Sequence, residues 1–348
     1  MRILILGNDY SSKEFFKFFE KNSDNIVFST IPSSKNYIRF DNLQDIVEFC
    51  EANDINLVLI NDEEYINQGV QEAISSLKIS AFSPSVDAVA ICSSKSYAKK
   101  FMHKNKILTP KFFVAEKPQM ALDYFKAEPK VLTIKPDSSS YQECPKFCET
   151  QNQIQKVVSE LFANGNKRII LEDYIEGKNI SFWVISDGYS AKIIGTSAKY
   201  QNNIALFEPD FITDEIKEKI YNEAIMPTIN SLSSQEEEYI GVLGFDFILT
   251  RENEAYLLGY NSFFDDINVE FYTKGFDINW AEVFDSTIVG DVFQKFSFAP
   301  KENNMLAIRQ NEKIYFISAN TRNNLKKYLK ELDFDLSEYS EAERIWKY

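Results

Sequence analysis

Two kinds of residue stand where a folded chain could use them for chemistry. Lys135 lies inside the apolar stretch "KVLTIKPD". A charged side chain is costly to bury there unless it meets an opposite charge, so we predict an anion beside it. The second kind follows the apolar residues of "YLLGYNSFFDD", where Gly259 and Asn261 precede two aspartates, Asp265 and Asp266. A strand end of this composition usually delivers ligands, yet Gly259 has no ligand atom.

Histidine and cysteine chemistry has little support. His103 is the single histidine, and its stretch "KKFMHKNK" is expected to be a solvated helix face. A Ser-His-Asp or Cys-His hydrolase is therefore disfavoured. Cys144 and Cys148 are too few and wrongly spaced for a zinc site, so we expect reduced thiols.

The composition is that of a globular protein with more than one domain. The 348 residues suffice for two or three domains, and 44% of them are hydrophobic. The net charge of −14 disfavours a general nucleic-acid surface, because such surfaces cluster Lys and Arg. No apolar run reaches the roughly 20 residues of a membrane span. The start, "MRILILGND", is too short for a signal peptide and is predicted to be a strand. We expect a cytoplasmic protein that binds neither nucleic acid nor membrane.

The elements of the first third alternate between strand and helix. We predict strands in "RILILG", "NIVFST", "INLVLI" and "ISAF", with helices at 11–21, 42–52 and 68–77 between them. This alternation predicts a parallel sheet with helices on both faces. Ligands of such sheets bind beyond the carboxyl ends of the strands, which here are 7–9 and 61–63. The first of these ends lacks the repeated glycines of a dinucleotide-binding loop.

The remaining pattern favours hairpins. Antiparallel pairs are predicted around Asp187-Gly188, between "GVLGFDFILT" and "EAYLLGYN", and in "NMLAIRQNEKIYFIS". Further strands are predicted in "KVLTIKPD" and "RIILEDYIEG", and helices at 213–232 and 321–332. Asp246 alternates with two phenylalanines in its strand, so its side chain faces away from them, toward either solvent or a site.

Four segments, in this order, resemble the ATP-grasp superfamily and, within it, the phosphoribosylamine–glycine ligases. They are "FSPSVDAVAICSSKSYAKKFM", "LTIKPD", "IILEDYIEGKNISFWVISDG" and "IMPTINSLSSQEEEYIGVLGFDFILTRENEAYLLGYN". The similarity extends with gaps over roughly residues 1–290. It implies an α/β protein with the ATP-grasp fold and an N-terminal parallel-sheet (pre-ATP-grasp) domain at 1–88. An ATP-grasp domain at 89–290, with a flexible lid subdomain at about 127–196, would precede a short α+β C-terminal domain at 291–348.

The resemblance also implies a nucleotide site. Enzymes of this superfamily activate a carboxylate as an acyl phosphate, which an amine then attacks, with ATP and Mg²⁺ as cofactors. Six residues match nucleotide-binding positions: Lys95, Lys135, Glu172, Asp173, Ile175 and Asn179. The two lysines would bind phosphate, although a solvated helix face is an alternative for Lys95. Asp173 and Ile175 would meet adenine through their backbone, and Asn179 replaces a glutamate that holds the ribose hydroxyls.

The implied metal site is incomplete. Asp246 and Asn261 match metal-binding positions, but Gly259 replaces the glutamate that bridges two Mg²⁺ ions, and Phe263 replaces the following arginine. Asp265 and Asp266 lie close by in the sequence, and either could supply an oxygen from another angle. The glycine-rich loop that covers the phosphates in the family corresponds here to "PDSSSYQECPKFC", which has no glycine.

The family's long glycine-rich substrate loop is reduced here to "QNNIALFEPD". The differences from the family thus fall on a substrate loop, the phosphate loop and the metal ligands together, while the apolar framework persists. We therefore favour a nucleotide-binding protein whose catalysis is impaired or lost, and we assign no catalytic residue. The alternative is an active ATP-dependent carboxylate–amine ligase with a rebuilt site, in purine biosynthesis or a related small-molecule ligation. A protein without nucleotide is a third interpretation, and it leaves the charge of Lys135 unexplained. The expected partners are a nucleotide and a small-molecule substrate, and no protein partner is indicated.

Overall fold

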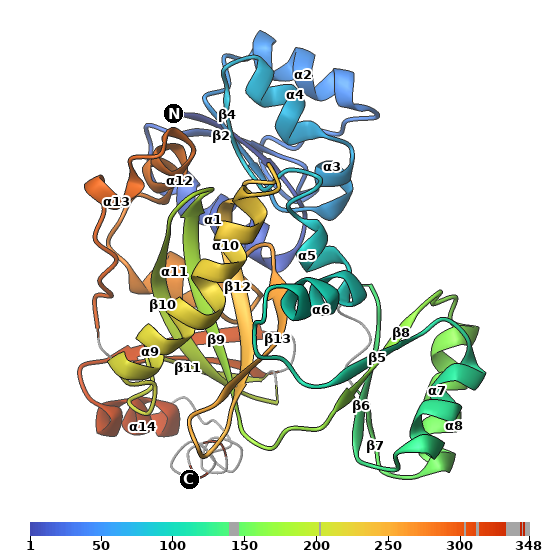
Figure 1. Ribbon diagram of the computed structural model, residues 1–348. Coiled ribbons are helices and arrows are strands. Elements are labelled where there is room, and N and C mark those ends of the chain that lie inside the picture. The colour runs from blue at the N-terminus through green and yellow to red at the C-terminus, as the bar shows by residue number, and fades with distance from the viewer. Residues whose placement is uncertain are drawn as a thin grey trace.

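The structure is a computed structural model of the chain, shown in Figure 1. It describes residues 1–138, 146–201, 203–302, 304–310 and 313–331, together with residues 342 and 344. Most of the predicted phosphate-covering loop, including Cys144, lies outside the described residues.

The chain begins with a four-stranded parallel sheet in the order β2-β1-β3-β4. Its strands are β1 Arg2–Leu6, β2 Ile26–Ser29, β3 Leu57–Ile60 and β4 Ser80–Phe82. The helices that cover it are α1 Tyr10–Glu20, α2 Leu43–Ala52, α3 Glu63–Asn67 and α4 Val70–Ser76. β1 and β3 are almost wholly buried and apolar, as expected of parallel strands between two helical layers. The predicted parallel sheet is confirmed.

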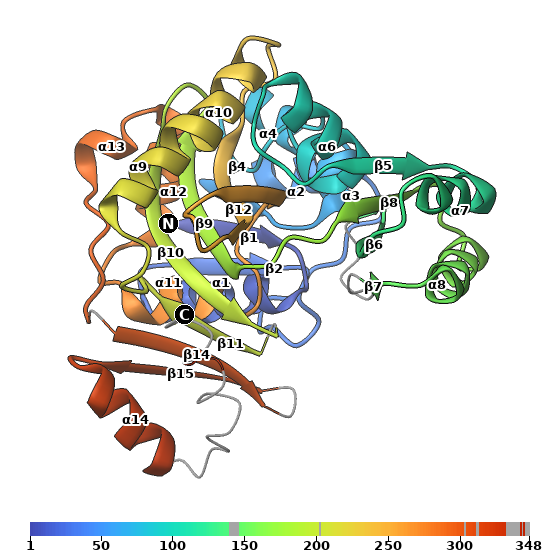
Figure 2. The same cartoon turned by 60° about the horizontal axis from the view of Figure 1, so that its bottom comes forward.

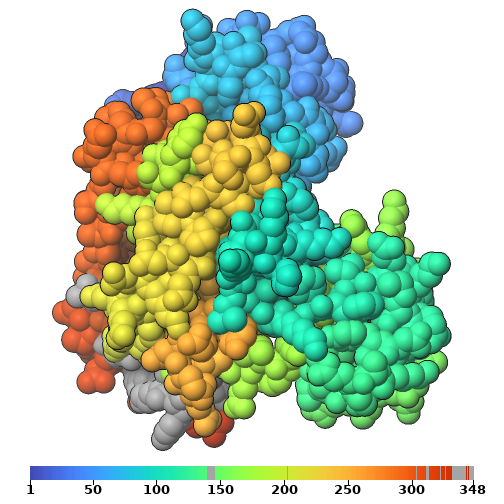
Figure 3. Space-filling model, in the orientation of Figure 1, coloured from blue at the N-terminus to red at the C-terminus, as the bar shows by residue number. Residues whose placement is uncertain are grey.

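A second unit projects from one side of the molecule (Figures 1 and 3). It is an antiparallel sheet in the order β5-β8-β6-β7. Its strands are β5 Phe112–Ala115, β6 Leu132–Pro136, β7 Lys146–Cys148 and β8 Ile169–Asp173. Helices α7 Pro118–Ala127 and α8 Gln151–Ala163 cover one face and form a separate small core with it. The opposite face carries Lys135 and Glu172, because side chains alternate along each strand. Helices α5 Ala90–Ser93 and α6 Lys95–Lys104 connect this unit to the first sheet.

The largest sheet has seven strands in the order β13-β12-β9-β10-β11-β14-β15, all paired antiparallel. They are β9 Lys178–Asp187, β10 Ala191–Tyr200, β11 Ile204–Phe207, β12 Ile240–Leu249, β13 Ala255–Asn261, β14 Asn304–Gln310 and β15 Lys313–Ala319. All three predicted hairpins are present in it.

Helices cover both faces of this sheet, as Figures 1 and 2 show. One face packs on α9 Asp214–Ile220, a π-helical turn at Tyr221–Ile225 and α10 Met226–Ser233. The other face packs on α11 Val269–Gly275 and α12 Trp280–Val289, which α13 Val292–Lys295 follows. Helix α14 Arg322–Glu331 lies against β14 and β15. In the described part of the chain, no helix has the length and apolar character that crossing a membrane requires.

Sheet membership bears on the predicted subdivision of the chain. β9 and most of β10, within the predicted lid at 127–196, are strands of the seven-stranded sheet. The hairpin β14–β15, within the predicted C-terminal domain at 291–348, extends the same sheet through β11. The domain boundaries themselves stay predictions.

Candidate functional site

Lys135 meets a protein anion. Its Nζ lies 2.7 Å from Oε2 of Glu172, and the two residues are only 7% and 2% exposed. The second oxygen of Glu172 lies 3.0 Å from Nζ of Lys99, a fully buried residue of α6. Glu172 of the neighbouring strand therefore supplies a negative charge to Lys135 from within the protein itself. The phosphate-binding role of Lys135 stays a prediction.

The start of α6 brings a further lysine, Lys95, to this pair. The Ser94 side chain caps the helix by accepting the Tyr97 amide, and it donates to Asp137 at 3.0 Å. These contacts hold the end of β6 against the helix, and Nζ of Lys95 donates to the Ser138 carbonyl. Lys95 and Lys99 are four residues apart, so they share one face of α6. Lys95 is half-buried at this position, and its role stays a prediction.

The cluster carries surplus positive charge. Lys99 and Lys135 both pair with the carboxylate of Glu172, and Lys95 is close enough to interact with its charge. Nearby Asp137 pairs with Arg168 at 2.9 Å. Burial, and then repulsion from Lys135, lowers the pKa of Lys95. Burial also lowers the pKa of Lys99 to about 8, against the attraction of Glu172. Burial raises the pKa of Glu172, but the two lysines outweigh it and hold that pKa below its ordinary value. A cluster of this kind is suited to bind an anion.

The predicted hinge at 172–175 forms backbone hydrogen bonds to neighbouring segments. The backbone amide of Asp173 donates to Lys111 and that of Tyr174 to Val131, at 2.9 and 3.2 Å. The Asp173 side chain pairs with Lys130 at 2.7 Å. Within the described residues the Ile175 amide has no such partner. A free amide at this position suits the backbone role predicted for Ile175.

The predicted metal residues converge on one face of the seven-stranded sheet, but a lysine stands between them. Lys199 of β10 places its Nζ 2.6 Å from Oδ2 of Asp265 and 3.2 Å from Oδ1 of Asp246. Burial lowers the pKa of Lys199, but these carboxylates outweigh it and raise the pKa above its ordinary value. Asn179 lies on the same face, cross-strand from Lys199, and is exposed.

Other donors of the chain occupy both carboxylates. Asp246 accepts the Ser181 hydroxyl on Oδ1 and the Asn261 amide on Oδ2, the latter at 2.8 Å. Burial raises the pKa of Asp246, but Lys199 and these hydrogen bonds lower it below its ordinary value. Asp265 accepts the side-chain amide of Asn268 on both oxygens, at 2.9 and 3.0 Å.

Gly259 is not required by the backbone. It pairs with Asp246 across the β12–β13 hairpin, next to a β-bulge. A Cβ placed at Gly259 would meet nothing within 4 Å, and its φ is outside the left-handed region. The fold therefore does not require glycine at position 259, and the loss of the glutamate removes a metal ligand without a structural cause. Phe263, in place of the family's arginine, is buried against Phe15 and Phe284 in the core.

These residues do not fit Mg²⁺. The ion requires a near-octahedral shell of oxygens at about 2.1 Å. Gly259 offers no oxygen, and the carboxylates of Asp246 and Asp265 accept hydrogen bonds from Lys199 and neighbouring side chains. Among the described residues, no group of three or more His, Cys, Asp or Glu side chains could hold a metal. The metal-binding role of Asp246, Asn261 and Asp265 stays a prediction, which this geometry does not favour.

Three residues of this arrangement, Lys99, Lys199 and Ser181, were not predicted from the sequence. Lys99 was recognisable as the residue one helical turn after Lys95, although nothing marked it as buried. Lys199 is the penultimate residue of the strand "SAKIIGTSAKY", and Ser181 lies near the start of the strand beside it. Only the strand pairing reveals that both side chains meet Asp246.

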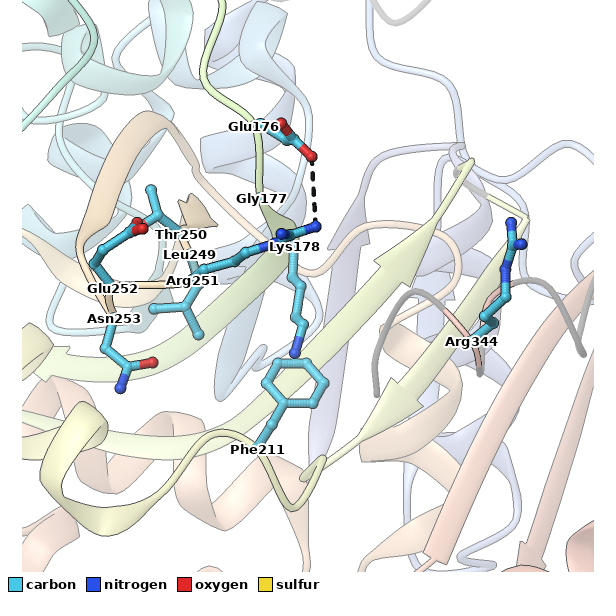
Figure 4. Close-up of a pocket in the computed structure, with 10 residues that line it drawn as sticks. All are labelled: Glu176, Gly177, Lys178, Phe211, Leu249, Thr250, Arg251, Glu252, Asn253 and Arg344. Atoms are coloured by element: carbon cyan, nitrogen blue, oxygen red, sulfur yellow. Dashed lines mark ion pairs between the residues drawn. The ribbon is translucent and has the colours of Figure 1, made fainter. Parts of the chain in front are cut away.

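A cavity of about 710 Å³ lies elsewhere, beside the β12–β13 turn (Figure 4). Its lining includes Lys178, whose Nζ lies 4.3 Å from the centre of the Phe211 ring, and Glu176, which pairs with Arg251. Lys178 and Asn179 are adjacent in β9, so their side chains point to opposite faces of the sheet. This cavity contains none of the six predicted nucleotide-binding residues.

Comparison with known proteins agrees with the resemblance seen in the sequence. Residues 93–269, just over half of the chain, match the family described as "Phosphoribosylglycinamide synthetase, ATP-grasp (A) domain". The phosphoribosylamine–glycine ligase of Clostridium acetobutylicum is 24% identical over 242 residues, which are 64% of this chain and 58% of that protein. The ligase of Helicobacter pylori strain 26695 is 25% identical over 249 residues, 66% of this chain and 57% of that one. The chain thus spans under two thirds of the length of these curated relatives.

Solved structures show the fold. The phosphoribosylamine–glycine ligase of Thermotoga maritima superimposes with a TM-score of 0.70 at 14% identity, covering 96% of both chains. The carboxyaminoimidazole ribonucleotide synthase of Aspergillus clavatus, complexed with ATP, gives a TM-score of 0.72 at 10% identity, covering 99% of this chain and 98% of that one. The predicted ATP-grasp fold is confirmed. This chain belongs to the phosphoribosylglycinamide synthetase family, which its ATP-grasp domain identifies.

Proposed function

We propose that this chain binds ATP, or a nucleotide like it, and that its ligation chemistry is impaired or absent. The observation that carries the binding half is the cluster of Lys95, Lys99 and Lys135 around Glu172. Buried cations beyond those that Glu172 neutralises are costly unless an anion reaches them. A polyphosphate is such an anion, and the family gives ATP as the ligand expected there.

The hinge backbone and Asn179 would make the remaining contacts to the nucleotide. The free amide of Ile175 and the backbone of Asp173 would meet the base at the hinge. Asn179 is exposed on the face that carries Lys199, where its side chain would reach a ribose hydroxyl without charge assistance.

Impaired ligation follows from the opposite end of the site. Forming an acyl phosphate places charge on the transferring phosphoryl group, which this superfamily stabilises with metal ions held by carboxylates. Gly259 supplies no carboxylate, and Lys199 already bonds to the other two. We therefore assign no step and no catalytic residue to this chain. A cytoplasmic location and a link to purine biosynthesis stay part of the proposal, because the relatives are matched over only part of their length.

Calorimetric titration of ATP tests the binding half. Lys95→Met should weaken ATP binding by about tenfold, since a charge-assisted hydrogen bond contributes roughly 1.5–3 kcal/mol. Lys111→Met, which removes an exposed lysine of the same unit paired with Glu128, is the matched control and should change nothing. No heat at millimolar ATP, or equal loss in both variants, would contradict nucleotide binding at this cluster.

An ADP-release assay with phosphoribosylamine and glycine, and then with a panel of acids and amines, tests the other half. We expect no ADP above the background of the uncatalysed mixture. Turnover that disappears in Asp246→Asn would establish instead the alternative, an active carboxylate–amine ligase.

A further inference from the structure

We propose that Lys199 is the resident cation of this site, so that the chain binds its nucleotide without a divalent metal ion. This inference deepens the proposed function, from which it takes the identity of the ligand. The claim that Lys199 keeps a metal away from the carboxylates is independent of the proposed function.

The contacts around Lys199 form a completed ionic site. Its Nζ lies between Asp246 and Asp265, and its side chain is only 14% exposed. Three further side chains hold the carboxylates in place, and each comes from a different part of the fold: Ser181 of β9, Asn261 of β13 and Asn268 just before α11. The site is therefore preorganised around an ammonium ion, and a metal would have to displace it.

The strand pairing explains why this lysine reaches the site. Lys199 and Ser197 alternate with Ala198 and Tyr200, which are buried in the core on the α9–α10 side of the sheet. The side chain of Lys199 must then lie on the opposite face, where Asp246 also projects from β12. β10 and β12 both flank β9, so the lysine reaches across that central strand to its partner.

The charge of the site and the number of hydrogen-bond donors on Lys199 indicate how this lysine would contact a ligand. One ammonium and two carboxylates leave a net charge of −1, compared with −2 if the lysine were absent. An ammonium has three donors, and in the described residues two of them are directed to Asp246 and Asp265. The third donor is left for an oxygen of a ligand. Lys199 can thus orient a phosphate oxygen through one hydrogen bond, while most of its charge is already balanced by Asp246 and Asp265.

Titration of Mn²⁺ in the absence of nucleotide tests the exclusion of metal directly. Free Mn²⁺, followed by its electron paramagnetic resonance signal, should show no stoichiometric site in the unmodified protein. Lys199→Ala should create one site, which the added change Asp246→Asn should weaken by about tenfold or more. Lys219→Ala is the matched control, because it removes the same charge from a pair with Glu254 at 2.8 Å outside the site, and it should bind no Mn²⁺.

Thermal unfolding provides a second readout. Lys199→Ala leaves two carboxylates unpaired, so it should melt at a lower temperature in EDTA and recover with Mn²⁺, whereas the unmodified protein should respond to neither. If the variant fails to fold, Mn²⁺ titration of the unmodified protein still tests the proposal. One Mn²⁺ bound per chain, and lost in Asp246→Asn, would overturn the proposal.

ATP titration with Mg²⁺ and with EDTA completes the test. The unmodified chain should bind ATP with dissociation constants within about twofold of each other, a difference of under 1 kcal/mol. The double variant Lys199→Ala/Gly259→Glu should bind ATP about tenfold more tightly with Mg²⁺. ATP affinity that already requires Mg²⁺ in the unmodified chain would refute the inference alone. Failure of ATP to bind in either buffer would refute the proposed function. The Mn²⁺ titration would then still show whether Lys199 excludes a metal ion.

Discussion

At the scale of single residues, Glu172 decides how the cationic cluster is held. It is buried, and each of its oxygens faces a different lysine, one from β6 and one from α6. Lys99 also donates to the carbonyl of Leu257 in β13, at 3.2 Å. The carboxylate therefore connects the projecting β5–β8 unit to α6, and through Lys99 to the large sheet. Removing one partner of a buried ion pair leaves the other charge uncompensated.

We expect Glu172→Gln to lower the free energy of unfolding by about 3 kcal/mol at pH 7. The pKa of Glu172 lies below its ordinary value of 4.5, so its stabilisation is present above that pH. It is lost as the pH falls through the lower, folded-state pKa, because the unfolded chain then binds the proton first. Urea unfolding between pH 7 and pH 3 should show a flatter pH dependence below 4.5 in Glu172→Gln than in the unmodified protein. Glu116→Gln, at an exposed position of the same unit, should reproduce the unmodified curve.

At the scale of elements, two of the glycines in the β12–β13 hairpin, Gly244 and Gly259, are there for opposite reasons. A Cβ at Gly244 would lie 2.5 Å from the ring of Trp183, a fully buried residue of β9. A Cβ at Gly259 would meet open space. The first glycine allows two strands and a large ring to pack, while the second leaves the face beside Asp246 bare. In this hairpin, packing requires the glycine at position 244, whereas the glycine at position 259 only removes a carboxylate.

Alanine at each glycine separates the two reasons. Gly244→Ala should lower the free energy of unfolding by about 1–3 kcal/mol, because the Trp183 ring must move in a close-packed core. Gly259→Ala should change it by less than about 0.5 kcal/mol. Paired denaturant titrations measure both values. Equal destabilisation by the two substitutions would mean that position 259 is packed and that its glycine has a structural cause.

At the scale of the whole molecule, residues far apart in the sequence share one core. Leu257 of β13 and Leu306 of β14 lie near opposite ends of the seven-stranded sheet, and both belong to the cluster that α9 and α10 cover. The same cluster includes Leu4 and Leu6 of the first sheet. A single apolar core of this extent favours cooperative unfolding over independent domains.

We expect Leu257→Ala and Leu306→Ala to shift the same calorimetric transition. Each should lower the free energy of unfolding by about 2–5 kcal/mol, since both leave a cavity in the shared core. Scanning calorimetry measures the transition, with near- and far-ultraviolet circular dichroism as a check that signals coincide. A separate transition that only Leu306→Ala moves would support instead an independent domain at 291–348.

Much of the architecture followed from local pattern. Alternating apolar segments predicted the parallel sheet, and turn residues predicted the three hairpins, because side-chain period and turn chemistry act over a few neighbouring positions. The isolated charge of Lys135 indicated that an opposite charge must meet it. The sequence led us to expect a phosphate there, and no local pattern identified Glu172 as a partner. The resemblance placed Asp246 and Asn261 together and marked Gly259 as the missing carboxylate.

Tertiary structure alone decided which charges meet. Glu172 was expected at a hinge, and the pairing of β6 with β8 placed it beside Lys135. Lys199 attracted no notice in the sequence, and the order of β10, β9 and β12 placed its ammonium against Asp246. The sequence by itself determined the elements and the absence of a ligand atom at position 259. The position of the Lys199 ammonium near Gly259 was decided by the pairing of strands that are distant in the chain. No local sequence pattern encodes that pairing.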